Sequence, residues 1–170
     1  GRNKEDACSP LLITVKGKTI ALLARSSVIV SSPSYAGHST PGVAFLEPDE
    51  LIDNIRRCRE KADLVIVLLH WGLEEYSYPA PAQVDLARQL VMAGTGAIIA
   101  HHPHVLQGMH RIDNALVAYS LGNFLFDEFS CVILFVKVLE CLNPKIKLST
   151  ALIVNFSDRN PRIISGNRQI

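Results

Sequence analysis

The sequence predicts an α/β domain that ends in antiparallel β-structure. Apolar runs alternate with amphipathic helical segments in the middle of the chain, and the C-terminal part has strand patterns only. At 170 residues the chain is long enough for one domain with a sizeable core. Its four cysteines are scattered and have neither metal-binding nor disulfide-scaffold spacing.

Charge and motif content narrow the function classes. The net charge is +1 with Lys and Arg scattered, which argues against a nucleic-acid-binding surface. No signal peptide is recognisable, and the apolar run Val132–Leu142 is too short to span a membrane. Glycine-rich phosphate loops and a Gly-x-Ser-x-Gly nucleophile motif are absent from the sequence.

The first third of the chain predicts a hairpin, a loop and a helix. Residues 1–10 are expected to form a polar lead-in. Leu11–Val15 and Thr19–Ala24 flank a short turn that contains glycine, and predict a β-hairpin. The Ser-, Pro- and Gly-rich segment Ser31–Pro41 predicts a loop. A helix is predicted from Glu47, because a proline and acidic residues occupy its first turn and apolar residues follow at helical spacing.

The middle of the chain predicts two buried strands around a second helix. The apolar run 64–69 is nearly continuous, so we expect this strand to be covered on both faces. Segment 71–82 is expected to be irregular. Residues Gln83–Ala93 predict an amphipathic helix that Gly94 ends, and a second strand follows at 97–100.

The last part of the chain predicts strands only. Leu116–Leu121 predicts a strand that ends at a Gly-Asn turn. Two further strands are predicted at 130–139 and 148–156, with a turn that contains proline between them. The segment 158–170 is expected to be an exposed tail.

Histidines follow directly on two of the predicted strands. His70 follows the first buried strand, and His101, His102 and His104 follow the second. Because the carboxyl ends of parallel strands meet at the edge of a sheet where ligands bind, we expect these imidazoles to lie close together. Neutral imidazoles are preferred ligands of borderline divalent metals.

The spacing of the second cluster indicates which histidines share an ion. Proline disfavours the α region for the preceding residue, so His102 is expected to be extended. In extended chain the side chains alternate, which places His102 and His104 on one side and His101 on the other. Together with His70 they predict a three-histidine metal site. Taken singly, each histidine is more often a hydrogen-bonded structural residue than a metal ligand.

Two other residues near these strand ends have open interpretations. Glu74 lies four residues after His70, and it either orients a ligand histidine, serves as a ligand or is a solvated carboxylate. Asn123 follows a strand-end glycine, and it either caps the turn or donates to a phosphate or carboxylate. His110 is assigned no role.

Four ordered motifs resemble a known family. They are His70-Trp71-Gly72-x-Glu74, Gln83-x-x-x-Ala87-Arg88, His101-His102-Pro103-His104 and Tyr119-Ser120-Leu121-Gly122-Asn123-Phe124-x-Phe126-Asp127. With them, residues 1–157 resemble the C-terminal half of the bacterial capsule-synthesis, poly-γ-glutamate CapA-type proteins, relatives of the calcineurin-like metallophosphoesterases. The resemblance implies a β-sandwich flanked by helices, a metal site at the strand ends, and a place at the cell membrane or its extracellular face.

The resemblance also implies roles for individual residues. His70, His102 and His104 match the metal-binding histidines, with Mn, Zn or Fe as the ion. His101 and Glu74 are then the catalytic candidates, and Asn123 is a candidate substrate contact. The implied substrate is an anionic polymer or a phosphoryl-containing molecule. The alternative is a catalytically incomplete binding or assembly module that acts with other capsule-synthesis proteins in a membrane-bound complex.

The sequence departs from the family at the carboxylate ligands. The family's Gly-Asp and Asn-His segments, which complete a two-metal site, lie before the matched region and are absent here. We therefore expect a domain that is incomplete on its N-terminal side and inactive alone. Three histidines can hold one Zn²⁺ with a water, whereas a second ion would need Glu74 or Asp127. Missing strands would leave an apolar sheet edge through which a homodimer could form.

Overall fold

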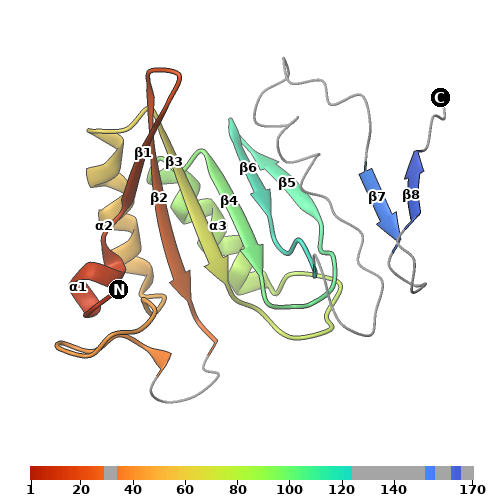
Figure 1. The fold of residues 1–170 in the computed structure, drawn as a ribbon, viewed down its shortest axis with the longest axis horizontal. Coiled ribbons are helices and arrows are strands. Elements are labelled where there is room, and N and C mark those ends of the chain that lie inside the picture. Colours follow the sequence, from red (N-terminus) through yellow and green to blue (C-terminus); the bar gives the residue numbers. More distant parts are fainter. Residues whose placement is uncertain (29–33, 124–151, 156–161, 166–170) are drawn as a thin grey trace.

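A computed structural model describes residues 1–28 and 34–123 with their side chains, and residues 152–155 and 162–165 as backbone. Six strands form one sheet in the order β1-β2-β3-β4-β6-β5 (Figure 1). The strands are β1 (Leu11–Val15), β2 (Lys18–Ser26), β3 (Leu64–His70), β4 (Ala97–His101), β5 (Met109–Ile112) and β6 (Ala115–Ala118). The helices are α1 (Lys4–Cys8), α2 (Pro48–Arg59) and α3 (Pro81–Met92). This helix-flanked sheet confirms the predicted α/β class.

The centre of the sheet is parallel and its two edges are antiparallel. Strands β2, β3, β4 and β6 run in the same direction, whereas β1 and β5 are the antiparallel partners of β2 and β6. In this register Ser26 pairs with His70, and His70 pairs with His101. The carboxyl ends of the parallel strands therefore deliver two histidines side by side at one edge.

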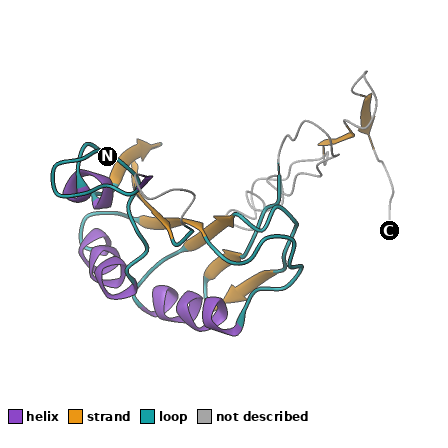
Figure 2. Ribbon diagram, turned by 90° about the horizontal axis from the view of Figure 1, so that it is seen from below, coloured by secondary structure: helices purple, strands orange, loops and turns teal. Residues whose placement is uncertain are grey.

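The core lies between the sheet and the two long helices, which cover the same face of the sheet (Figure 2). Leu51 and Ile55 of α2 and Leu90 of α3 are fully buried against Leu23 of β2 and Val67 of β3. Helix α2 begins at a proline, has acidic residues in its first turn and has arginines in its last, as the helix dipole favours.

The burial of β3 differs from the prediction on the face of the sheet opposite the helices. Along β3 the residues alternate between buried and half-buried, so only the face toward the helices is fully covered by the described residues. The apolar run was expected to be buried on both faces. Leu64, Ile66 and Leu68 instead lie on the half-exposed face, because both long helices pack on the other side. At the edge of the same sheet, the apolar residues of β1 are exposed.

Several short elements differ from the sequence prediction. Helix α1 lies inside the predicted lead-in, and its N-cap Asn3 accepts a hydrogen bond from the Asp6 amide at 2.8 Å. Strand β5 was not predicted, helix α3 begins at Pro81, two residues early, and β6 ends at Ala118. None of the helices in the described part of the chain is both long and apolar enough to cross a membrane.

The C-terminal predictions are only partly covered by the structure. The predicted strand 130–139 lies outside the described residues. A two-stranded antiparallel sheet is formed by β7 (Leu152–Asn155), which lies within the predicted strand 148–156, and β8 (Arg162–Ser165), which lies within the predicted tail.

Candidate metal centre

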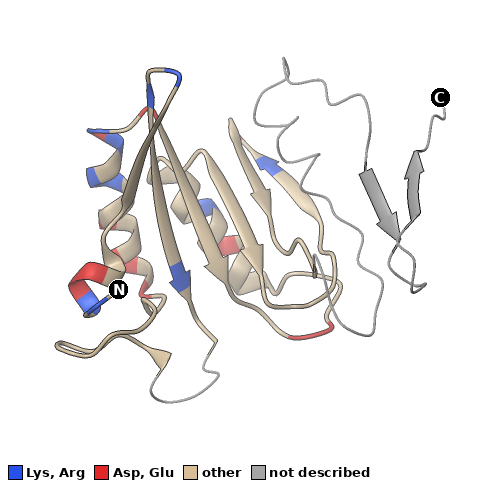
Figure 3. Cartoon of the chain, in the orientation of Figure 1, with Lys and Arg blue, Asp and Glu red and all other residues tan. Residues whose placement is uncertain are grey.

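The candidate site lies at the carboxyl edge of the parallel strands, where the loops after β3 and β4 leave the sheet. His70 ends β3 and His101 ends β4. The Trp71 amide donates to the His101 carbonyl at 3.1 Å, so the pairing continues one residue beyond the strand. Figure 3 shows acidic residues in the loop after β3 at this edge, whereas basic residues gather at the β1–β2 turn and at the end of α2.

The two loops are fixed to each other by hydrogen bonds. The Glu75 amide donates to the Pro103 carbonyl at 2.8 Å. The side-chain amide of Gln107, which is itself buried, donates to the Tyr76 carbonyl at 2.8 Å. These contacts hold the loop that carries Glu74 against the loop that carries the second histidine cluster.

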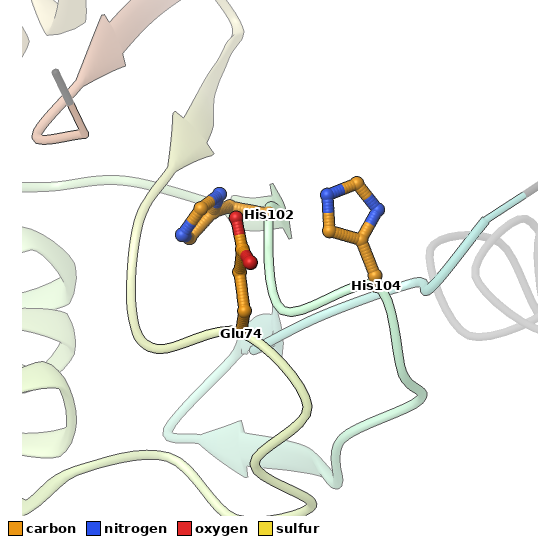
Figure 4. A group of neighbouring side chains, drawn as sticks. All are labelled: Glu74, His102 and His104. Carbon is orange, nitrogen blue, oxygen red and sulfur yellow. The ribbon is translucent and has the colours of Figure 1, made fainter. Parts of the chain in front are cut away.

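Glu74, His102 and His104 form a group that could hold a metal ion (Figure 4). One potential ligand atom from each of the three residues lies within 4.8 Å of the others, and His102 is the most buried of the three. An ion that binds nitrogen and oxygen at about 2 Å keeps two of its ligands within roughly 4 Å of each other. The widest separation in the group is therefore at most about 1 Å above that limit.

His70 lies next to this group rather than within it. Its ring centroid is 4.8 Å from that of His102, and the His102 and His104 centroids are 5.9 Å apart. Burial lowers the pKa of His70, and the nearby His102, His101 and His104 lower it further. His70 is thus favoured as a neutral imidazole with a lone pair, the form that binds metal.

The backbone of the histidine loop differs from the prediction. His102 has a φ of 103° and His104 a φ of 59°, so the extended conformation expected for the residue before Pro103 was wrong. The chain turns around Pro103, whose side chain is fully buried, and this turn brings both imidazoles toward Glu74. Local backbone preference is overridden here by packing and by the bonds between the loops.

His101 is exposed and stands apart from the three-residue group. Together with His70 it lines a largely apolar cavity of about 440 Å³ whose wall includes Ala24, Leu68 and Val43. His101 therefore lies beside the three-residue group and not within it. Its catalytic role stays a prediction.

Asn123 contacts a site histidine directly. Its side-chain oxygen is 2.6 Å from Nδ1 of His104. The sequence suggested a turn cap or a substrate contact at this position, and the pairing with His104 was missed. The sequence analysis also gave no structural role to Ser120, which is buried and donates to the Val105 carbonyl at 2.8 Å. A hydroxyl between apolar neighbours in a buried segment is the signal that could have found it, since buried polar groups need partners.

Residues 1–128 match the family described as bacterial capsule synthesis protein PGA_cap, and the chain belongs to this family. It is 36% identical over 132 residues to the capsule biosynthesis protein CapA of Bacillus anthracis, across 75% of this chain and 32% of that protein. It is 40% identical over 115 residues to the PGA biosynthesis protein CapA of Bacillus subtilis (strain 168), across 67% of this chain and 30% of that protein. The predicted family is thereby confirmed, and the match spans about a third of the length of these relatives.

Among solved structures, the chain is similar to the sulfate thiohydrolase SoxB of Thermus thermophilus. The TM-score is 0.45 and the sequence identity 22%, over 67% of this chain and 20% of that one.

Proposed function

We propose that this chain carries the divalent-metal site of a capsule-synthesis protein that acts in making or anchoring an anionic cell-surface polymer. Membership of the capsule synthesis family supports a role in capsule biosynthesis, and the names of the two relatives refer to capsule and PGA biosynthesis. The observation that carries the metal-site proposal is the convergence of Glu74, His102 and His104 from two loops at one edge of the sheet.

The donor atoms suit a divalent transition metal. Two imidazoles and one carboxylate form a ligand set that proteins use for Zn²⁺ and for Fe²⁺. His70 adds a further imidazole beside His102, and its lowered pKa favours the neutral, metal-binding form. The residues present therefore fit a bound ion, with Glu74, His102 and His104 as its ligands and His70 within reach.

The chemistry proposed for the site is of the phosphoesterase type. A bound divalent ion supplies a Lewis acid for a phosphoryl oxygen and lowers the pKa of a bound water. We propose His101, which is exposed beside His70 at the cavity, as the residue that binds a substrate anion or transfers a proton; its exposure and its position in the cavity wall support this role. Asn123 holds His104, and Glu74 closes the ligand set from the opposite loop.

A second candidate function is a binding or assembly module that holds one ion without turnover. The composition of the ligand group favours it, because a single carboxylate, Glu74, joins the two histidines among the described residues. A two-metal phosphoester site clamps both oxygens of the displacement between its ions, and it needs more carboxylate than this. In this version the polymer and other capsule-synthesis proteins are binding partners, and the exposed apolar edge at β1 is where a second copy would pair.

Metal stoichiometry tests the site, and turnover separates the two functions. The full chain, stripped with chelator and titrated with Zn²⁺, Mn²⁺ or Fe²⁺, is expected to bind about one equivalent by elemental analysis and calorimetry. Failure of all three ions to bind stoichiometrically would overturn the metal site. Hydrolysis of bis(p-nitrophenyl) phosphate by the loaded chain would favour the enzyme, whereas one bound ion without hydrolysis would favour the binding module.

A further inference from the structure

The contact between Asn123 and His104 is oriented in a way that bears on metal binding. Figure 4 shows one ring nitrogen of His104 facing Glu74 and His102, and the other facing away from them. The nitrogen that contacts Asn123 is Nδ1, at 2.6 Å from the amide oxygen. The nitrogen that faces the ligand group is therefore Nε2.

We infer that Asn123 is a positioning residue that fixes the tautomer of His104 for metal binding; this inference rests on the metal site proposed above. An amide oxygen only accepts hydrogen bonds, so the Nδ1 of His104 must carry the proton and donate it. A neutral imidazole has one N–H, which leaves the lone pair on Nε2, directed at Glu74 and His102. Asn123 thus selects the form of His104 that can bind an ion.

Hydrogen bonds fix the segment before Asn123 to the end of β4 and to the loop that carries His104. The Leu121 amide donates to the Ala100 carbonyl at 2.9 Å, which ties the segment to the end of β4. The Ser120 hydroxyl donates to Val105 at 2.8 Å and accepts from the Gly122 amide at 3.2 Å. These hydrogen bonds fix the backbone of the segment before Asn123. A residue that orients a metal ligand needs such a fixed position.

Gly122 allows this arrangement. Its φ is +65°, and a Cβ at this position would lie 3.3 Å from the Leu106 amide nitrogen. A side chain there would strain the turn and press on the loop that leads back to His104. The turn thus directs the next residue, Asn123, at His104.

The experiment compares Asn123→Ala and Asn123→Asp with the unaltered full chain. Long-range ¹H–¹⁵N spectra of the metal-free proteins report which nitrogen of His104 is protonated, and His104→Ala assigns the signal. We expect the Nδ1–H form in the unaltered chain, its loss in Asn123→Ala, and its retention in Asn123→Asp, because a carboxylate is also an acceptor. Zn²⁺ affinity should fall by about 10- to 100-fold in Asn123→Ala and recover in Asn123→Asp.

The outcomes separate this inference from the proposed function. If Asn123→Ala keeps both the Nδ1–H form and the Zn²⁺ affinity of the unaltered chain, the positioning role is wrong. If the unaltered chain binds no Zn²⁺, the metal site fails, and the spectra still decide whether Asn123 sets the tautomer. Loss of thermal stability in Asn123→Ala without a change in tautomer would indicate a turn cap only and would overturn the inference.

Discussion

The helix-covered face of the sheet and its carboxyl edge are built in different ways. On the covered face, buried apolar residues of β2 and β3 meet those of α2 and α3 in regular helix and strand conformations. At the carboxyl edge, three residues of the two loops, Glu75, His102 and His104, have positive φ. They are three of the five non-glycine residues with positive φ in the described part of the chain.

This difference separates the part that stabilises the fold from the part that the proposed function uses. Each non-glycine residue in a disfavoured backbone region costs roughly 1–3 kcal/mol and persists only where its surroundings hold it. Here the surroundings are hydrogen bonds between loops, such as those that reach Pro103 and Val105. Strain that is concentrated beside a group of metal-ligand side chains is what a preorganised site predicts.

The largest expected effect comes from removing the most buried ligand. His102→Ala should weaken Zn²⁺ binding by at least about 100-fold, because His102 neighbours both His70 and His104 and belongs to the ligand group with Glu74. Calorimetric titration measures this change. His110→Ala is the matched control: it removes an exposed histidine on β5 and should bind as the unaltered chain does. Equal affinities for the two variants would disprove the assignment of His102.

Removal of a core side chain should lower the stability of the fold and leave Zn²⁺ binding unchanged, the opposite of what is expected for His102→Ala. Leu51→Ala deletes a fully buried side chain of α2 and should lower the free energy of unfolding by about 3 kcal/mol. Chemical denaturation measures the loss, and Zn²⁺ affinity at 25 °C should be unchanged while the protein remains folded. Leu68→Ala, on the half-exposed face of β3, is the matched comparison and should cost less. A larger loss in Leu68→Ala would mean that this face is the better packed one.

The same division explains what the sequence could predict. Helix α2 follows from apolar residues at helical spacing, β3 from a continuous apolar run, and the hairpin from its glycine turn between two apolar segments. The continuous run predicted the strand β3 but not which of its faces is covered. The histidines at the strand ends follow from the direction of parallel strands. The short elements α1 and β5 have too few residues for a periodic signal, so they were missed.

Contacts between distant segments could not be predicted. The Asn123–His104 bond joins residues 19 apart, and the Trp71–Tyr119 bond joins residues 48 apart. Neither has a local pattern in the sequence. The extended conformation predicted for His102 was wrong for the same reason. The hydrogen bonds that hold its loop come from the loop after β3 and from the segment after β6, which are distant in the sequence.

Trp71 connects the two regions and should show an intermediate effect. Its ring is buried and stacks on Tyr119, and its Nε1 donates to the Tyr119 carbonyl at 3.1 Å. Trp71→Phe keeps an aromatic ring and removes the donor, which should cost about 1–3 kcal/mol because a buried carbonyl loses its partner. Thermal and chemical unfolding measure this loss. Zn²⁺ affinity should fall less than in His102→Ala, and a fall as large would place Trp71 within the site itself.

The smallest effect is expected at Glu50, a charged residue at the start of α2 on the covered side. A hydrogen bond with Cys8 lowers the pKa of Glu50 most, and Lys4 and Arg25 lower it further, against the opposing effect of burial. A carboxyl whose pKa is lower in the folded than in the unfolded state stabilises the fold above its ordinary pKa. This contribution is lost as the pH falls through the lowered value.

Glu50→Gln should therefore reduce the free energy of unfolding at pH 7, and the difference from the unaltered chain should shrink toward pH 3. Denaturant titrations at both values measure the two differences. Cys8→Ala removes the largest cause of the shift and should reproduce part of this pH dependence. A constant difference across the range would show that Glu50 acts through packing rather than through its charge. Zn²⁺ binding at pH 7 should be unaffected, because the charges around Glu50 belong to α1, β2 and α2 and not to the loops that hold the ligand residues.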